Sequence, residues 1–322
     1  EAVQRVPGVF LERDQGEGRF IGIRGIDPNL NVTTINGLYV PSPESGARSV
    51  ALDVIPSDLL ASLEISKTFT PDMDMSAIGG AVNVRSLSAF DRQGRYLTVS
   101  AEGGYNGLVE ETSPKIAGSY TNTFGDSFGL ALAASWFDRD FGSDNIETDG
   151  GWPNDLETIG GSTFQGAEEI EQRSYTVNRE RIGLAANLDW RSDRSQFYWR
   201  NLYSEFSDQE YRMRNEFKFD DGDAVSGDSS SAQWQDAVIE KSMKDRLEEQ
   251  TILSSVLGGE HYVNQWTFDY AYGYSFSQEE EPMNMFWFLV IAIGIATVAA
   301  FLFAKTRGCW AEGIGGGVKF GL

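Results

Sequence analysis

The stretch QWTFDYAYGYSF (residues 265–276) decides the fold class, because its side chains alternate strictly between two kinds. One set is aromatic and consists of Trp266, Phe268, Tyr270, Tyr272, Tyr274 and Phe276. The other set is polar or small and consists of Gln265, Thr267, Asp269, Ala271, Gly273 and Ser275. Successive side chains of a β-strand point to opposite faces, so this pattern predicts a strand with one apolar and one polar or small face.

The same period of two recurs in FGLALAASWF (residues 128–137) and in RIGLAANLDW (residues 181–190). We count seven candidate strands, at about 95–106, 114–124, 127–138, 174–191, 196–208, 241–260 and 265–278. Three of the connections are short turns, whereas two contain roughly 30 residues each, and short turns on one side with long loops on the other are typical of an outer-membrane barrel. Part of an antiparallel transmembrane β-barrel is therefore the predicted architecture of this region.

A soluble β-sandwich also has alternating strands and remains an alternative. Strands of ten or more residues with an aromatic-rich face favour the membrane. Seven strands are too few to close a barrel around the domain that precedes them, and lipid does not tolerate an open sheet edge. We therefore expect the barrel to be incomplete at its C-terminal side.

Composition excludes several classes of function. The 322-residue chain has a net charge of -22, from 48 acidic and 26 basic side chains, which argues against a nucleic-acid partner. A single cysteine (Cys309) and a single histidine (His261) exclude an intramolecular disulfide and a Cys/His zinc cluster. No Ser/His/Asp arrangement or phosphate loop is present, so we expect no catalytic residues, no metal and no cofactor. The acidic residues Asp140, Asp144, Glu147 and Asp149 match no rigid calcium loop, and a solvated surface explains them better.

Residues 1–92 have a different pattern, which predicts a compact mixed α/β domain. RFIGIRGID and NVTTINGLYV are expected to form short strands, and Pro56 and Ser57 mark a helix start that leads into the β-type LEISK. The opening EAVQRVPGVF has no signal-peptide features, so we expect the start of the chain to be missing.

The order VPGV, IRG, INGLYV, IPSDLLASLEISKT and IGGAVNVRS, followed by alternating strands, resembles the TonB-dependent outer-membrane receptors. The resemblance covers residues 1–281: the C-terminal portion of the plug domain at 1–92 and the first barrel strands at 93–281. Each motif alone is weak, whereas their order and spacing are specific. The run PSDLLASLEISKTFTPDMD is similar to a receptor subgroup associated with uptake of carbohydrates or other nutrients.

The resemblance implies energy-coupled uptake of a scarce nutrient, such as a carbohydrate or a siderophore, across the outer membrane of a Gram-negative bacterium. In this family a plug fills a wide barrel, a small ligand binds on the outer side, and TonB with its inner-membrane motor complex moves the plug. The TonB box would lie upstream of Glu1. Outer-membrane lipid is the other implied partner, and nucleic acid is not one.

Two sets of plug residues follow from the resemblance. The ligand-facing candidates are Asp27, Asn29, Asn31, Tyr39, Pro41, Ser42, Glu44 and Arg48. The motif and structural candidates are Arg24, Gly25, Asn36, Gly37, Glu64, Ile78, Gly79, Gly80, Asn83 and Arg85. Among these, Arg24, Glu64 and Arg85 either pair with charges on the inner wall of the barrel or are ordinary exposed strand residues.

Residues 282–322 do not fit the family pattern. From Pro282 to Ala304 no side chain is charged, and a helix of this length would span a bilayer. The sequence therefore predicts an apolar helix, foreign to the receptor from about Met283 onward. This helix leaves open a single-pass membrane protein that displays a β-rich binding domain, and the strand pattern leaves open a passive porin, which lacks a plug.

Overall fold

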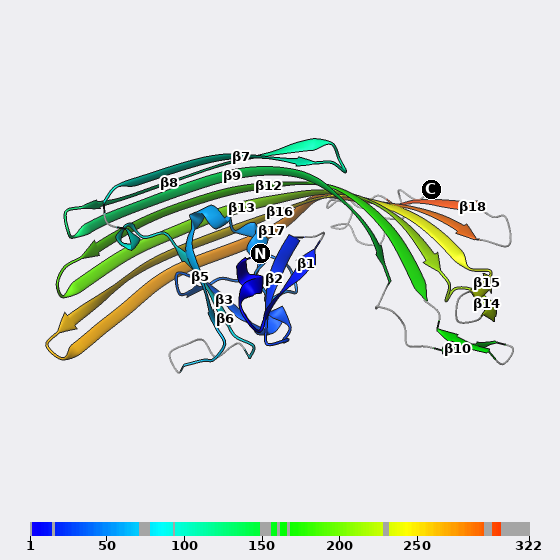
Figure 1. Cartoon of the computed structure of the whole chain (residues 1–322), viewed down its shortest axis with the longest axis horizontal. Coiled ribbons are helices and arrows are strands. Elements are labelled where there is room, and N and C mark those ends of the chain that lie inside the picture. The colour runs from blue at the N-terminus through cyan, green and yellow to red at the C-terminus, as the bar shows by residue number, and fades with distance from the viewer. Residues whose placement is uncertain are drawn as a thin grey trace, which may run out of the picture.

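The large element of the fold is an eight-stranded antiparallel sheet that curves over a smaller N-terminal domain (Figure 1). The computed structural model describes residues 2–14, 17–70, 78–92, 94–148, 156–159, 162–165, 168–227, 232–292 and 298–303. Within these residues the sheet has the order β18-β17-β16-β13-β12-β9-β8-β7, so it has two edges and does not close into a barrel.

Strands that follow one another around the sheet are joined by turns or by long connections that carry small hairpins. The strands are β7 (Tyr96–Asn106), β8 (Glu111–Phe124), β9 (Phe128–Glu147), β12 (Glu169–Arg191), β13 (Ser195–Lys218), β16 (Val238–Val263), β17 (Trp266–Ala292) and β18 (Val298–Phe303). The hairpin of β10 (Leu156–Ile159) and β11 (Ser162–Gln165) lies between β9 and β12, and that of β14 (Asp223–Gly227) and β15 (Ala232–Gln235) lies between β13 and β16. The short turns between β8 and β9, β12 and β13, and β16 and β17 lie at one end of the sheet, whereas the two long connections and the turn between β7 and β8 lie at the other.

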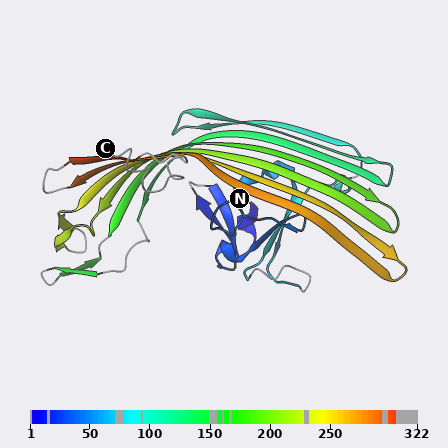
Figure 2. The ribbon, with the colours of Figure 1, turned by 180° about the vertical axis from the view of Figure 1, so that it is seen from behind.

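The N-terminal domain, which we call the plug, lies under the concave face of the sheet in both views (Figures 1 and 2). It contains the hairpin β1 (Val9–Asp14) and β2 (Glu17–Ile23) and a four-stranded sheet of β3 (Val32–Ile35), β4 (Leu38–Tyr39), β5 (Leu60–Ser66) and β6 (Ala81–Ser86). Its helices are single 3₁₀ turns: η1 (Ala2–Arg5), η2 (Pro28–Leu30), η3 (Leu52–Val54), η4 (Ser57–Leu59) and η5 (Ala89–Asp91).

The plug therefore differs from the mixed α/β domain that the sequence predicts, because its described residues contain no α-helix. The helix start at Pro56 and Ser57 exists, but the 3₁₀ turn ends at Leu59. Pairing of β5 with β6 satisfies the backbone from Leu60 onward, so the chain becomes a strand where a helix would have continued.

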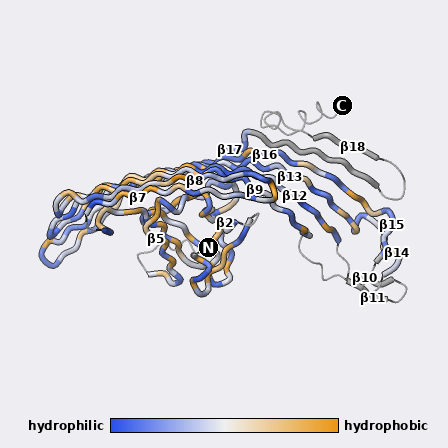
Figure 3. Tube along the Cα trace, turned by 45° about the horizontal axis from the view of Figure 1, so that its top comes forward, coloured by the Kyte–Doolittle hydropathy of each residue, from blue (hydrophilic) through white to orange (hydrophobic). Residues whose placement is uncertain are grey.

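The two faces of the large sheet have opposite character. On β12, Arg181, Ala185, Asn187 and Asp189 are buried beneath the plug, whereas Leu184 on the other face is 50% exposed. The outward face carries further exposed apolar side chains: Leu97, Ile116, Leu132, Trp199, Leu257, Tyr272, Tyr274 and Phe276. Hydrophobic stretches recur along the part of the sheet around β7 and β8 (Figure 3). The polar and small face is thus the inner one, and the apolar face is exposed.

The predicted C-terminal helix is wrong for the part that the structure describes. Pro282–Ala292 continues β17, and Val298–Phe303 forms β18, which pairs with β17. The long edge of β16 explains this difference, since pairing with it satisfies the backbone of β17 as far as Ala292. Pro282 has no N–H to donate, and it falls in the register shift between Leu247 and Glu249, where a proline is tolerated. Residues 293–297 and 304–322 of the predicted helix lie outside the described residues.

No helix among the described residues has both the length and the apolar character needed to cross a membrane.

Candidate functional site

The interface between the plug and the inner face of the sheet is the candidate functional site, and glycines of the sheet make its close packing possible. A Cβ atom at Gly183 of β12 would lie 2.7 Å from the Leu59 side chain, and one at Gly273 of β17 would lie 2.6 Å from Leu38. Nearby, Ala133 and Ala185 join Leu59 in one buried apolar cluster. Small residues on the inner face of the large sheet, which we call the wall, therefore let the plug approach the sheet backbone.

Polar contacts fix the orientation of the plug against the wall. The Asn187 amide donates to Ser86 Oγ at 2.8 Å, and Ser88 Oγ donates to Asp189 at 2.8 Å. Ser204 Oγ donates to the carbonyl of Val54 at 2.5 Å. Because these groups are buried, each lost bond would leave an unsatisfied polar atom, so the contacts define one seated position.

Glu17, at the tip of the β1–β2 hairpin, is the centre of an ionic cluster that joins the plug to the sheet. Its carboxylate pairs with Arg179 at 2.7 Å, with Arg181 at 2.7 Å, and also with Arg139. Arg179 is 1% exposed and has a second partner, Asp208, at 2.9 Å. Burial lowers the pKa of Arg139, and the neighbouring Arg181 and Arg179 lower it further. One plug carboxylate thus holds three mutually repelling arginines of the wall.

Arg19, two residues after Glu17 on β2, is the centre of a second ionic cluster. It pairs with Glu44 at 2.6 Å and with Asp53 at 3.7 Å in the plug, and with Glu248 of β16 at 3.6 Å. Burial raises the pKa of Asp53 even though Arg19 and other arginines oppose the shift. Burial also raises the pKa of Glu44, again against the effect of Arg19. These two buried carboxylates are therefore costly to hold in the ionised form.

The turn predicted to face a ligand, from Asp27 to Asn31, is held within the plug. Asp27 caps η2 by accepting from the Asn29 amide at 2.8 Å. Asn29 Oδ1 accepts from the backbone of Arg48 at 2.9 Å and from Ser49, which ties this turn to the end of the 39–48 loop. Asn31 is buried and donates to the carbonyl of Ile21 at 2.9 Å. Asn31 therefore has a structural contact, whereas Arg48 is exposed.

The 39–48 loop lies against β17. Ser275 donates to the carbonyl of Tyr39 at 2.8 Å, and Ser277 donates to the carbonyl of Ser42 at 3.2 Å. The Ser45 amide donates to Glu279 at 3.1 Å. Pro41 is half-buried in the same loop, and Glu44 pairs with Arg19 as described above. The structure thus brings this loop to the wall, where Tyr39 retains 39% of its exposure.

The motif residues make turns and contacts inside the plug. Arg24, Gly25, Asn36 and Gly37 all have positive φ, from 52° to 83°. Asn36 Oδ1 accepts from the amide and the hydroxyl of Ser86 at 3.0 Å each, which joins β6 to the turn after β3. The remaining motif residues also bond or pack within the plug: Asn83 donates to Glu64 at 3.0 Å, Arg85 pairs with Asp91 at 3.1 Å, Gly79 and Gly80 pack against Asn31 and Ile23, and Ile78 donates its amide to Leu30.

The ionic contacts of the plug hairpin with the sheet come from Glu17 and Arg19, which were not among the residues singled out from the sequence. Glu44, which was expected to face a ligand, pairs with Arg19 inside the plug. Lys115 of β8 adds a pair with Asp58 of the plug at 2.9 Å. A signal for the wall residues was present in the sequence: Arg179, Arg181, Asp208, Glu210, Arg246 and Glu248 occupy alternating positions on the polar face of their strands.

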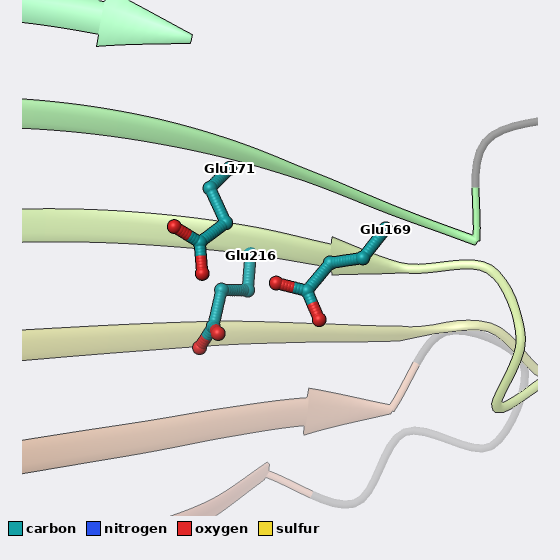
Figure 4. Close-up of side chains that lie close together, drawn as sticks. All are labelled: Glu169, Glu171 and Glu216. Carbon is teal, nitrogen blue, oxygen red and sulfur yellow. The ribbon is translucent and has the colours of Figure 1, made fainter. Parts of the chain in front are cut away.

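Three carboxylates near the long connections, Glu169, Glu171 and Glu216, converge within 4.8 Å of one another (Figure 4). Arg214 pairs with Glu171 at 2.9 Å and with Glu216 at 2.6 Å, and Arg173 also pairs with Glu171. Burial raises the pKa of Glu216 to about 7. Because arginines occupy the places of a cation, we assign no metal to this cluster.

The comparisons with known proteins agree with the architecture of the N-terminal domain. Residues 1–81 match the family described as TonB-dependent Receptor Plug Domain. This part of the chain is therefore a TonB-dependent receptor plug domain, which confirms the resemblance seen in the motifs. No match to a curated protein was found.

Three solved structures illustrate the likeness of the whole chain. A mutant ferric enterobactin receptor from Pseudomonas aeruginosa is 12% identical, with a TM-score of 0.36, and the match covers 94% of this chain and 56% of that one. The ferric citrate transporter FecA in its unliganded form is 13% identical, with a TM-score of 0.36 and coverage of 90% and 59%. The siderophore receptor PirA from Acinetobacter baumannii is 11% identical, with a TM-score of 0.36 and coverage of 94% and 56%.

The chain thus spans between 56% and 59% of the length of these solved structures. The match of residues 1–81 to the plug-domain family carries the assignment.

Proposed function

We propose that this chain is part of a TonB-dependent outer-membrane receptor, in which residues 1–92 belong to the plug and residues 93–281 are barrel strands. The observation that carries the proposal is that the two faces of the sheet are arranged in the opposite way to those of a water-soluble protein. The polar and small face packs on a TonB-dependent receptor plug domain, and the apolar face is exposed. A contiguous exposed apolar face of this extent has a high cost in water and suits lipid.

The apolar band gives the position of the membrane. On β12 the outward apolar residues run from Ile182 to Trp190, a span of nine residues, which matches the roughly 9–11 residues that a tilted strand needs to cross a bilayer. Glu169 to Arg181 then extend beyond the band toward the long connections. We infer that this end faces the outside of a Gram-negative cell and that the three short turns at the opposite end face the periplasm.

The proposed mechanism is energy-coupled uptake of a scarce nutrient, such as a siderophore or a carbohydrate. The ligand binds on the outer side against the plug and the extended strands. TonB and its inner-membrane motor complex then pull the plug. Ionic contacts such as those of Glu17 and Arg19 suit this action, since they are specific while the plug is seated, and water hydrates both partners again when the plug moves away.

Two alternatives are less well supported. A passive porin requires an open lumen, whereas here the plug packs against the inner wall through apolar, polar and ionic contacts. A single-pass anchor would need the apolar helix, whose described part is strand instead.

The test is ligand-dependent growth of a bacterium that carries the whole gene, measured with and without a working TonB motor. We expect growth on the limiting nutrient to require the motor, while entry of a small solute through an ordinary porin in the same cells stays unchanged. Uptake that continues at the same rate after loss of the motor would contradict the proposal.

A further inference from the structure

The outward face of the large sheet is hollowed within its apolar band. The hollow has a volume of about 490 Å³ and crosses the neighbouring strands β7, β8, β9, β12, β13 and β16. Its lining includes three small residues and three leucines: Gly118, Ala134, Ala186, Leu132, Leu184 and Leu253. We call this hollow the groove.

The pairing of the strands explains the shape of the groove. Gly118 of β8 pairs with Ala134 of β9, and Ala134 pairs with Leu184 of β12. In the next outward row Leu132 pairs with Ala186. The small residues form the floor of the groove, whereas Leu132 and Leu184 are 42% and 50% exposed and rise beside it as walls.

The groove lies in the half of the band that is nearer to the long connections. There the Trp136 indole donates to Glu180 at 2.7 Å, and the Tyr203 hydroxyl donates to Glu205 at 2.7 Å. Trp and Tyr with their polar ends in a hydrophilic layer are typical of a membrane interface. At about 3.3 Å per residue, Leu184 lies about 13 Å along β12 from Glu180, so the groove lies beneath this interface at the depth of the outer leaflet's acyl chains.

Polar side chains at the depth of the groove bond to one another within the sheet. The Asn201 amide donates to the carbonyl of Ala186 at 2.9 Å, and Asn201 Oδ1 accepts from Ser255 at 2.7 Å. Ser255 Oγ in turn accepts from the Trp199 indole at 3.2 Å. Hydrocarbon requires such internal satisfaction, because it offers no donor or acceptor. The groove therefore presents apolar contacts, which suit an acyl chain better than a partner protein that would hydrogen-bond to it.

We propose that the groove binds one acyl chain of an outer-leaflet lipid and holds it in preference to the other positions on the sheet. This inference rests on the proposed function, which places the outward face in the membrane, and it adds a lipid-binding site to that face. A chain in the groove contacts the floor and both walls, whereas a chain on the flat part of the sheet is contacted on one side. Lipid chains are as apolar as leucine, so the additional dispersion contacts supply the preference.

The first test is photo-crosslinking of the full chain in vesicles of dimyristoylphosphatidylcholine. The probe is a phosphatidylcholine with a diazirine in the middle of one acyl chain, and mass spectrometry measures the label at each position. Leu257 is the matched reference for Leu184, because it is 53% exposed on the same face and does not line the groove. We expect labelling around Leu184 to exceed that around Leu257 roughly threefold, the effect of a few additional dispersion contacts.

The groove and the proposed function can fail separately in this experiment. Equal labelling around Leu184 and Leu257 would overturn the groove and leave the outward face in lipid. Absence of label at both positions would show that this face does not meet lipid, which would refute the proposed function together with the groove.

The second test fills the groove. Ala134→Leu and Ala186→Leu place larger side chains on its floor, and each is expected to reduce labelling around Leu184 to the level of Leu257. Ala101→Leu is the matched control, because Ala101 is exposed on the same face of β7 and does not line the groove. Unchanged labelling of Leu257 in the same sample shows that each variant remains in the bilayer. Labelling around Leu184 that stays high in the filled variants, or falls equally in all three, would overturn the site.

Discussion

The contacts of Glu17 allow the sharpest prediction about how the plug is held. Glu17→Gln keeps the shape of the side chain and removes the charge that three wall arginines share. Glu17 is 15% exposed and Arg179 is 1% exposed, so the charge left behind is buried. Removing one partner of a buried pair typically costs about 3–5 kcal/mol. Because Asp208 still compensates Arg179, we expect a loss of about 2–4 kcal/mol in the free energy of unfolding.

The assay is urea unfolding of the chain in detergent micelles, followed by tryptophan fluorescence. Glu12→Gln is the matched control, since Glu12 lies on the same hairpin and is exposed. We expect it to change the free energy of unfolding by less than about 0.5 kcal/mol, as is usual for surface substitutions. If both variants lose the same amount of stability, the ionic cluster does not hold the plug and the reasoning is refuted.

Three further predictions concern other contacts of the plug. Burial raises the pKa of Asp53, so this carboxyl binds more protons in the folded state than in the unfolded state, and the free energy of unfolding should fall as the pH rises from the unfolded pKa through the higher folded pKa. Asp53→Asn should reduce this pH dependence in unfolding titrations. Unlike Glu17→Gln, it should not destabilise the chain at a pH above the folded pKa. Gly183→Val would bring a side chain against Leu59 and should lower the free energy of unfolding by about 1–3 kcal/mol through overpacking. Gly103→Ala should be tolerated, because a Cβ atom there meets nothing within 4 Å. Equal losses of stability in the two variants would count against the close packing. Asn29→Ala removes the acceptor for the end of the 39–48 loop and should raise the rate of proteolytic cleavage in that loop, and unchanged cleavage would show that β17 alone holds it.

For several of the barrel-type strands, one end was predicted better than the other. The expected strand at 174–191 ends where β12 does, at Arg191, but β12 begins earlier, at Glu169. Likewise the strand expected at 196–208 continues in β13 to Lys218. The missed part of β12, residues 169–173, lies beyond the apolar band and contains a single apolar side chain, Ile170, so the period of two carries little hydrophobic contrast there.

The ionic interface was harder to predict, for a physical reason. Glu17 and Arg179 are 162 positions apart, and only the packing of the plug against the wall brings them together. Pairing with the barrel wall was one expectation for Glu64 and Arg85, whose contacts in the structure lie within the plug. The prediction of a helix from Pro282 onward was wrong for a related reason. Helix and strand are hard to separate in a continuous apolar run, and pairing with the edge of β16 makes this segment a strand as far as Ala292.

The central claim is that the apolar face of the sheet meets lipid while its polar face meets the plug, and one spin-label measurement tests it most directly. Cys309 is replaced by Ser, and single cysteines are placed at Leu184 on the outer face and at Ala185 on the inner face. After reconstitution into membranes, collision with dissolved oxygen, which concentrates in lipid, is compared with collision with a water-soluble nickel complex. We predict that the label at 184 collides mainly with oxygen and that the label at 185 collides little with either. A label at 184 that collides mainly with the nickel complex would contradict the account.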